Sequence, residues 1–244
     1  MAVIIELKNV WFSAQSRILA RNINFEYEEG KTTALIGPAG GGKSTLLKLS
    51  AGLLVPDQGE VRFRGKDVFR MNRKENLEFR REGAVVFQDS ALWANQNLFQ
   101  ILELPLRLHF PGMTARDRMR RIETVVSEVG YRKELNVRPA QLSMGEQKLL
   151  AFARALLCHP RLLYLDEWTE SLDSTAAQRL IGLVKRCQRE GNTVIFVSHN
   201  LAVISELADH IVMILGGQIF LKVTREQINS DEDLMRYVQK GMGA

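Results

Sequence analysis

The segment GPAGGGKST, residues 37–45, constrains the fold of this chain more than any other part of the sequence. It satisfies the pattern G-x-x-x-x-G-K-[ST], with Gly37, Gly42, Lys43 and Ser44 at the defining positions. The residues before it, KTTALI, are typical of a short buried strand, and STLLKLSAGLL after it has apolar residues at helical spacing. The pattern therefore predicts a strand–loop–helix unit that binds the phosphates of a nucleotide.

The residue types of this segment suit that chemistry. Glycines let backbone N–H groups curl around phosphates, and the helix that follows adds the positive end of its dipole. We expect Lys43 to reach the β- and γ-phosphate oxygens and the Ser44 hydroxyl to ligate Mg²⁺. The nucleotide-binding residues predicted in the segment are Gly37, Pro38, Ala39, Gly40, Gly41, Gly42, Lys43, Ser44 and Thr45.

Strand and helix patterns alternate along the rest of the chain. Strands are expected at 4–12, 22–30, 31–38, 60–68, 83–88, 161–167, 193–199, 210–215 and 218–223. Helices are expected at 44–54, about 175–190 and 201–208, and residues 90–160 are typical of helices, one of them capped by Thr114 with Asp117. This order predicts an α/β domain with a mostly parallel sheet and a helical insertion.

Composition and charge exclude few functions. The chain has 244 residues, 45% of them apolar and 25% charged, which suits one large or two small globular domains. Its longest apolar runs have strand length, and its first residues lack signal-peptide features, so we expect a cytosolic protein. Cys158 and Cys187 fit no metal or disulfide pattern and are expected to be reduced. The net charge of +5 suits a polyphosphate, an acidic membrane surface or nucleic acid, but also an ordinary basic surface.

Two adjacent acids end the apolar run RLLYLDE. In a phosphate-loop protein the neighbouring strand commonly ends in an acid that helps to hold Mg²⁺. Because neighbours alternate in direction along a strand, we expect Asp166 to face the metal and Glu167 to face an attacking water. This arrangement suits a water-activating ATPase better than a kinase or a switch GTPase.

The stretch LSMGEQ at 142–147 stands directly before a predicted helix. By itself it is either a helix cap or a phosphate-recognition turn. Four further segments follow the phosphate loop in a set order: VVFQDS with Gln88, then LYLDE, SLD with Asp173, and VSHN with His199. In isolation Gln88 and His199 would be ordinary polar strand ends, and Asp173 a helix cap. Together with LSMGEQ, in this order, the chain resembles an ATP-binding cassette (ABC) ATPase over nearly its whole length.

The resemblance implies an α/β fold: a P-loop NTPase cassette with a RecA-like parallel-sheet core, an N-terminal antiparallel β region and a helical subdomain. Residues 1–244 would form a single ABC ATPase domain. Residues 1–88 and 160–244 would make the catalytic core with its β region, and about 89–159 the helical subdomain with the LSMGEQ signature. The expected ligands are ATP and Mg²⁺.

The family's site residues carry over onto matching positions. The resemblance implies that Ser44 and Gln88 ligate Mg²⁺, with Asp166 acting largely through water. Lys43 and His199 would neutralise charge on the transferred phosphoryl group. Catalysis is expected from Lys43, Glu167 and His199, with Glu167 polarising the attacking water.

The signature residues imply a dimer. In the family, Ser143 and Gly145 at the signature would bind the γ-phosphate that the opposite subunit holds. With one cassette in this sequence, a head-to-tail dimer of two copies with two shared sites is expected, opened and closed by hydrolysis.

Three positions depart from the family pattern. Met144 replaces the first glycine of the usual signature, and Trp168 follows Glu167 where proline is usual. The adenine-stacking aromatic would fall near Ala14, whereas the nearest aromatics are Trp11 and Phe12. Either Phe12 stacks on the base, or base stacking is weak.

The segment 87–110 bears on the partners. In membrane-coupled ABC subunits it lines a groove for a permease segment, and an exposed cluster of Trp93, Leu98 and Phe99 would suit that role. The alternative is that these residues pack the helical insertion. This segment and the tail at 230–241 are similar to cassettes of Mla/Mce-type lipid transporters. That likeness implies phospholipid or other hydrophobic cargo, a permease, an MCE-domain protein and a position at the cytoplasmic face of the bacterial inner membrane.

Three alternatives remain open. Amino-acid and lipoprotein-release cassettes share the same scaffold. A soluble ABC ATPase acting on nucleic acid or ribosomes usually has two cassettes or a long coiled-coil insertion, and the basic runs at 70–81 and 116–121 are explained by solvated helix faces, so no nucleic acid is expected. A non-hydrolysing regulatory cassette is disfavoured by the intact Lys43, Asp166, Glu167 and His199.

Overall fold

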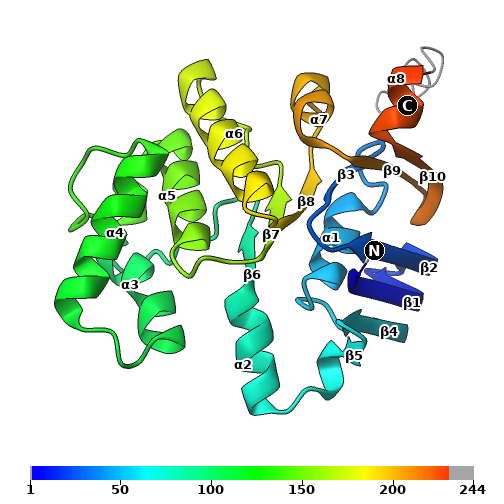
Figure 1. Ribbon diagram of the computed structural model, residues 1–244, viewed down its shortest axis with the longest axis horizontal. Helices are drawn as coiled ribbons and strands as arrows, with labels where there is room; N and C mark the ends of the chain where they lie inside the picture. The colour runs from blue at the N-terminus through cyan, green and yellow to red at the C-terminus, as the bar shows by residue number, and fades with distance from the viewer. Residues whose placement is uncertain (1, 231–244) are drawn as a thin grey trace.

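Two β-sheets organise residues 2–230, the part of the chain that the computed structural model describes (Figure 1). The strands are β1 (Val3–Ala14), β2 (Arg17–Glu28), β3 (Thr32–Ile36), β4 (Gln58–Phe63), β5 (Lys66–Asp67), β6 (Gly83–Val86), β7 (Leu162–Asp166), β8 (Thr193–Val197), β9 (His210–Leu215) and β10 (Gln218–Thr224). The larger sheet has the order β10-β9-β3-β8-β7-β6 and the smaller β2-β1-β4-β5. The expected α/β fold, with a mostly parallel sheet and a separate N-terminal β region, is thereby confirmed.

Helices surround the larger sheet. They are α1 (Lys43–Ser50), α2 (Arg73–Glu82), α3 (Leu98–His109), α4 (Ala115–Val129), α5 (Met144–Leu156), α6 (Ser174–Arg189), α7 (Leu201–Leu207) and α8 (Arg225–Ser230), with 3₁₀ turns at Val68–Arg70 and Pro139–Gln141. The basic run at 70–81 lies largely in α2, whose Asn72 cap accepts a hydrogen bond from Glu75 N. All but the first residue of the 230–241 tail lies outside the described residues.

The larger sheet is buried on both faces. Along β7, Leu163 and Leu165 pack in one core with α5, α6 and α7, whereas Leu162 and Tyr164 pack in the other with α1 and the smaller sheet. This alternation explains the continuous apolar runs in these strands. Strands β9, β3, β8, β7 and β6 are parallel, and only β10 is antiparallel to its neighbour. Their carboxyl ends therefore meet at one edge, where α/β proteins bind ligands.

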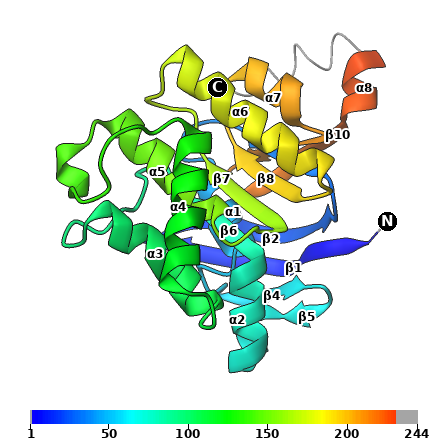
Figure 2. The ribbon, with the colours of Figure 1, turned by 60° about the vertical axis from the view of Figure 1, so that its left-hand side comes forward.

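Helices α3, α4 and α5 lie together at one side of the molecule, away from the smaller sheet (Figures 1 and 2). Leu102, Ile122 and Leu150, one from each helix, are each no more than 1% exposed and share one core. The N-cap of α4 is Thr114, whose Oγ1 accepts a hydrogen bond from Asp117 N at 3.2 Å, as the sequence predicted. The helical segment thus packs as a unit against the edge of the larger sheet that β6 forms.

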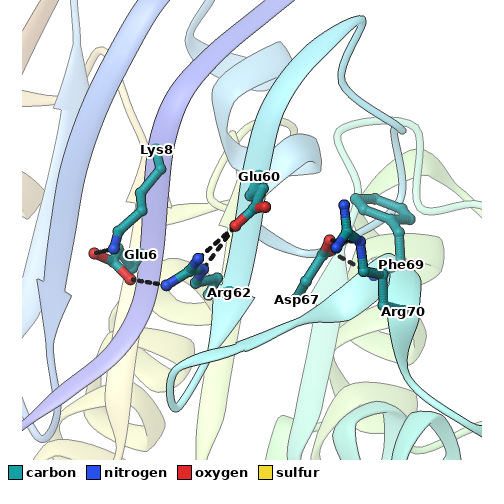
Figure 3. Close-up of polar contacts among 7 residues, drawn as sticks. All are labelled: Glu6, Lys8, Glu60, Arg62, Asp67, Phe69 and Arg70. Atoms are coloured by element: carbon teal, nitrogen blue, oxygen red, sulfur yellow. Dashed lines mark hydrogen bonds and ion pairs between the residues drawn. The ribbon is translucent and has the colours of Figure 1, made fainter.

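The smaller sheet has one polar and one apolar face. Ile5, Leu7 and Val61 are buried on the inner face. On the other face Glu60 and Arg62 form an ion pair, with Arg62 Nη2 2.6 Å from Glu60 Oε2 (Figure 3). Such exposed ion pairs contribute little to stability. The sheet therefore stabilises the core through its inner face, and its outer face is solvated.

Candidate active site

The phosphate loop connects β3 to α1 and lies tightly against two other segments. Gly37 has φ 137°, and a Cβ at this position would lie 2.2 Å from the carbonyl oxygen of Ile214. Gly42 has φ 100°, and its Cβ would lie 2.4 Å from the carbonyl oxygen of Leu19. No other residue fits either place without moving backbone. The loop thus surrounds a hollow of about 140 Å³ lined by Leu19 and residues 40–45.

Lys43 begins α1 and turns back into the loop. Its Nζ donates hydrogen bonds to the carbonyl oxygens of Gly37 and Pro38, each at 2.9 Å. Burial lowers the pKa of Lys43, and the carboxyl groups of Glu167 and Asp166 oppose that shift. Phosphate oxygens are charged and are stronger acceptors than these carbonyls, so the ammonium group is positioned to exchange one for the other.

Ser44 and Asp166 come together from α1 and the end of β7. The Ser44 hydroxyl donates to Asp166 Oδ1 at 2.8 Å, and Asp166 is only 2% exposed. Burial raises the pKa of Asp166, against the opposing effects of this hydrogen bond and of Lys48 and Lys148. Gln88 lies two residues beyond β6. Together with Ser44 and Asp166 it lines a hollow of about 630 Å³, which we call the cleft. Its lining residues are Ser44, Lys48, Phe87, Gln88, Asp89, Ala91, Met144, Asp166, Glu170 and Ser171.

The oxygen atoms of Ser44, Gln88 and Asp166 fit Mg²⁺. The ion prefers hard oxygen ligands and usually keeps several waters, with few protein groups and substrate phosphates completing its shell. Among residues 2–230 no group of three or more His, Cys, Asp or Glu side chains could form an all-protein metal site. These three oxygen donors would leave positions in the shell of the ion for water and for phosphate oxygens.

Glu167 differs from its sequence-based prediction in how it is oriented. Strand β7 ends at Asp166, and Glu167 has a left-handed φ of 41°. Strand alternation therefore does not set its direction; a turn does, in which Glu167 N donates to Val197 O at 3.2 Å. Glu167 is 5% exposed, and burial, followed by the charge of Glu170, raises its pKa to about 7. A carboxyl group with that pKa is suited to general-base chemistry near neutral pH.

His199 lies beside Glu167. Its Nε2 is 2.9 Å from Glu167 Oε1, and the residue follows β8 by two positions. Burial and the nearby Lys43 lower the pKa of His199, so its ring is neutral at pH 7. A neutral ring forms no salt bridge with the Glu167 carboxyl group, and Glu167 Oε1 has no hydrogen-bond partner within residues 2–230.

The LSMGEQ segment begins α5 as a complete capping box. Ser143 Oγ accepts a hydrogen bond from Glu146 N at 3.2 Å, and Glu146 Oε2 accepts one from Ser143 N at 3.0 Å. A Cβ on Gly145 would lie 2.9 Å from the carbonyl oxygen of Ser171, so the first turn of α5 needs a glycine here. Met144 is 72% exposed and lines the cleft of its own chain.

Two departures from the family pattern have different surroundings. Trp168 is fully buried, with its ring centroid 5.6 Å from that of Phe152 in α5. Phe12 is partly buried against the core beneath the smaller sheet, and Leu19 is the apolar side chain that lines the hollow at the phosphate loop. The structure therefore does not bring Phe12 into that hollow.

Sequence reasoning missed two charged residues near the cleft. Lys148 is 2% exposed, and its Nζ donates to the carbonyl oxygens of Phe87 and Gln88. Glu170 accepts a hydrogen bond from Gln88 Nε2 at 3.1 Å. Each lies close in sequence to a recognised motif, but its partner is at least 60 residues away, so no local signal identifies it.

A second, apolar hollow of about 510 Å³, which we call the groove, lies between α2, α3 and the segment after β6. Trp93, Leu104 and Leu108 line it and are 45%, 42% and 57% exposed. Of the two interpretations left open for Trp93, Leu98 and Phe99, packing in the helical insertion holds for Leu98, which begins α3 and is fully buried in the helical core. Phe99 is partly buried against that core as well.

Comparison with known proteins agrees with this geometry. The sequence profile of the ABC transporter family matches residues 20–170. The chain is 35% identical to the intermembrane phospholipid transport system ATP-binding protein MlaF of Haemophilus influenzae, over 97% of this chain and 89% of that protein. It is 32% identical to the nickel import ATP-binding protein NikE of Escherichia coli, over 93% and 87% of the two chains.

Solved structures agree as well. An ATP-binding cassette in a dimeric, post-hydrolysis state with ADP and Pi is 28% identical to this chain, with a TM-score of 0.83 over 91% of this chain and 99% of that one. In residues 2–230 no helix is both long and apolar enough to span a membrane. The chain belongs to the ABC transporter family, and it is an ATP-binding, ATP-hydrolysing cassette of a transporter.

Proposed function

We propose that this cassette powers the transport of phospholipid or another hydrophobic cargo through a separate permease of Mla/Mce type. The observation that carries the proposal is the 35% identity to MlaF of Haemophilus influenzae, a protein named for intermembrane phospholipid transport, along 97% of this chain. An MCE-domain protein would belong to the same complex, and the cassette would lie at the cytoplasmic face of the bacterial inner membrane.

A second candidate is import of a small solute. NikE of Escherichia coli, named for nickel import, is 32% identical over 93% of this chain. MetN of Francisella tularensis, named for methionine import, is 31% identical over 84%. Partners of the cassette select the cargo. Lipid transport and solute import would therefore differ in the permease with which the cassette associates.

The geometry of the phosphate loop supports the role we propose for it. Its glycines allow the loop amides to surround the phosphates, and Lys43 exchanges its carbonyl partners for phosphate oxygens. Mg²⁺, when bound, would supply positive charge that offsets the negative charge of the phosphates. Ser44, Gln88 and Asp166 would hold it, and they line one cleft.

Glu167 is the residue best suited to activate water. A pKa near 7 gives its carboxylate enough basicity to take a proton, and His199 Nε2 lies 2.9 Å from its Oε1. His199 and Lys43 would both face the transferred phosphoryl group. After burial, the charge of Glu170 is the next cause that raises the pKa of Glu167.

We further propose that two copies act head to tail. The first turn of α5 carries backbone N–H groups without a partner inside the helix, and the Ser143 hydroxyl lies beside them. This combination favours the binding of anions. Ser143 and Gly145 would bind the γ-phosphate of the ATP held by the second copy. The similar solved cassette described as dimeric supports this arrangement. Residues of about 89–159 would then move as the helical subdomain against the core of 1–88 and 160–244.

The groove is the proposed site for a permease segment. It is largely apolar, and its charged lining residues, all within residues 2–230, are basic: Arg80, Arg81 and Arg154, with no Asp or Glu among them. The chemistry favours a short amphipathic helix with large apolar side chains and at least one carboxylate. A membrane permease with such a cytoplasmic helix is the occupant we propose.

Purification from the native membrane tests the cargo and the partners together. The tagged chain would be extracted in mild detergent, its companions identified by mass spectrometry, and bound lipids measured by lipid extraction and chromatography. We expect a multi-span permease, an MCE-domain protein and enriched phospholipid. Recovery with a permease that carries nickel or methionine, or with ribosomes, would contradict the lipid-transport proposal while leaving the ATPase assignment intact.

A further inference from the structure

We propose that Glu170 is a positioning residue that orients the Gln88 side chain so that its carbonyl oxygen faces the metal position beside Ser44 and Asp166. The inference rests on the proposed role of Gln88 as a Mg²⁺ ligand. Its basis is the hydrogen bond that Gln88 Nε2 donates to Glu170 Oε2, at 3.1 Å, across the cleft that all four residues line.

The chemistry of an amide makes this bond directional. A glutamine side chain has a donating NH₂ on one side and an accepting oxygen on the other, and a half turn exchanges them. A carboxylate only accepts, so Glu170 pairs with the NH₂ and not with the oxygen. The carbonyl oxygen of Gln88, which is the only atom of this group that can ligate Mg²⁺, is then directed away from Glu170.

The backbone of Gln88 is already restrained by another residue. Lys148 in α5 donates from Nζ to the carbonyl oxygens of Phe87, at 3.2 Å, and of Gln88. Lys148 is 2% exposed, so these bonds are shielded from water. With the backbone held from α5, the side-chain torsions are the main freedom left to Gln88, and Glu170 restricts them.

Glu170 itself is held by a tight turn. Its backbone N–H donates to the carbonyl oxygen of Glu167 at 3.2 Å. Within that turn, Trp168 is fully buried and its ring packs on Phe152 of α5. The large side chain that replaces the usual proline therefore anchors the turn to the same helix that carries Lys148. Helix α5 thus determines both where the Gln88 backbone lies and where its orienting carboxylate stands.

The expected consequence is a loss of metal-dependent nucleotide affinity. Partners that orient a metal ligand typically change metal affinity by about 10–100-fold when they are removed. The effect should appear only when Mg²⁺ is present, because Glu170 makes none of the proposed phosphate contacts.

The test is equilibrium binding of a non-hydrolysable ATP analogue to the full chain by calorimetry, once with Mg²⁺ and once with EDTA. Glu170→Ala should weaken binding about 10-fold with Mg²⁺ and leave binding in EDTA unchanged. Glu170→Gln keeps an acceptor but adds a donor, so both amide orientations become available and its loss should be smaller than that of Glu170→Ala. Glu60→Ala, which removes an exposed ion-paired carboxylate of the smaller sheet, is the matched control and should change neither constant.

A double-mutant cycle separates this proposal from the metal assignment on which it rests. If Glu170 acts through Gln88, then Gln88→Ala and the double variant Gln88→Ala/Glu170→Ala should have equal Mg²⁺-dependent losses. Three outcomes would overturn the role of Glu170 while leaving the metal assignment standing. They are additive losses in the double variant, an equal weakening of binding in EDTA, or no effect of Glu170→Ala beside a clear effect of Gln88→Ala. If Gln88→Ala itself leaves Mg²⁺-dependent binding unchanged, both the metal assignment and this inference are wrong.

Discussion

The cleft and the groove share Phe87 and Ala91 in their walls, yet the cleft has the larger share of polar groups. The cleft, about 630 Å³, combines apolar side chains with hydroxyl, carboxyl and amide groups, some of which are fixed by hydrogen bonds, such as Ser44 to Asp166. The groove, about 510 Å³, is mostly aliphatic and aromatic. Fixed polar groups suit chemistry at a defined position, and apolar area suits association with another surface.

The segment between the two hollows is held from one helix. Lys148 binds the carbonyl oxygens of Phe87 and Gln88, and Arg154 binds those of Ser90 and Ala91, at 3.2 and 2.7 Å. Both side chains belong to α5. A displacement of α5 relative to the sheet therefore moves the wall of the cleft and the wall of the groove together. One backbone segment can thus form part of a polar site and of an apolar binding surface, because different side chains line the hollow on each side of it.

The largest effect is expected in the cleft. Glu167→Gln removes the proposed base while keeping its shape, so ATP turnover should fall by about 10²–10⁴-fold with ATP binding retained. Phosphate release measures turnover, and light scattering after chromatography with ATP should detect an accumulated dimer. Turnover at the parent rate would mean that another group activates the water.

A groove variant should separate association from chemistry. Leu108→Asp places a charge on a 57% exposed apolar position, so recovery of the chain with its permease should fall by at least about 10-fold. ATP turnover of the isolated chain should be unchanged. Leu77→Asp, at a 41% exposed leucine of α2 outside the groove lining, is the matched control. An equal loss of permease recovery for both variants would show that the groove is not the site where the permease binds.

The pH dependence of turnover sharpens the chemistry of the cleft. Burial raises the pKa of Glu167 to about 7, and only the ionised carboxylate can accept a proton. Turnover should therefore rise with pH through a midpoint near 7, and at pH 6 it should be about one-tenth of its plateau. The profile of kcat at saturating ATP tests this. A midpoint near 4.5, the ordinary value for glutamate, would show that the carboxyl group is better solvated during turnover than in this structure.

The smallest effect is expected at Met144. Its side chain is 72% exposed on the cleft wall and is not one of the proposed ligands. Met144→Gly should leave turnover within a few-fold of the parent, partly because a glycine in a first helical turn costs only about 1 kcal/mol. Ser143→Arg, which fills the anion-binding end of α5, is the contrasting variant and should abolish turnover. Full activity of Ser143→Arg would show that the LSMGEQ segment caps α5 and does not bind the γ-phosphate.

Much of the fold follows from local pattern. The parallel strands, α1 after the phosphate loop and the capping of α4 by Thr114 were predicted because strand period, glycine placement and cap chemistry depend on nearby residues. The sequence left open whether Leu98 is exposed or packed, because its exposure depends on how α3 packs against α4 and α5. The direction of Glu167 was explained wrongly because the left-handed turn there involves Val197, 30 residues away.

The sequence by itself determined that this chain binds nucleotide phosphates, because that chemistry requires glycines and a lysine at set spacing, and spacing is visible in one dimension. The order of the further motifs added the resemblance to an ATP-binding cassette. Only the tertiary structure revealed that Lys148 and Glu170 meet at Gln88 and that the cleft and the groove have one wall in common. A buried charge is stable only beside partners that the fold supplies. Those partners come from α5, the end of β6 and the turn after β7, and their meeting depends on packing across the whole domain.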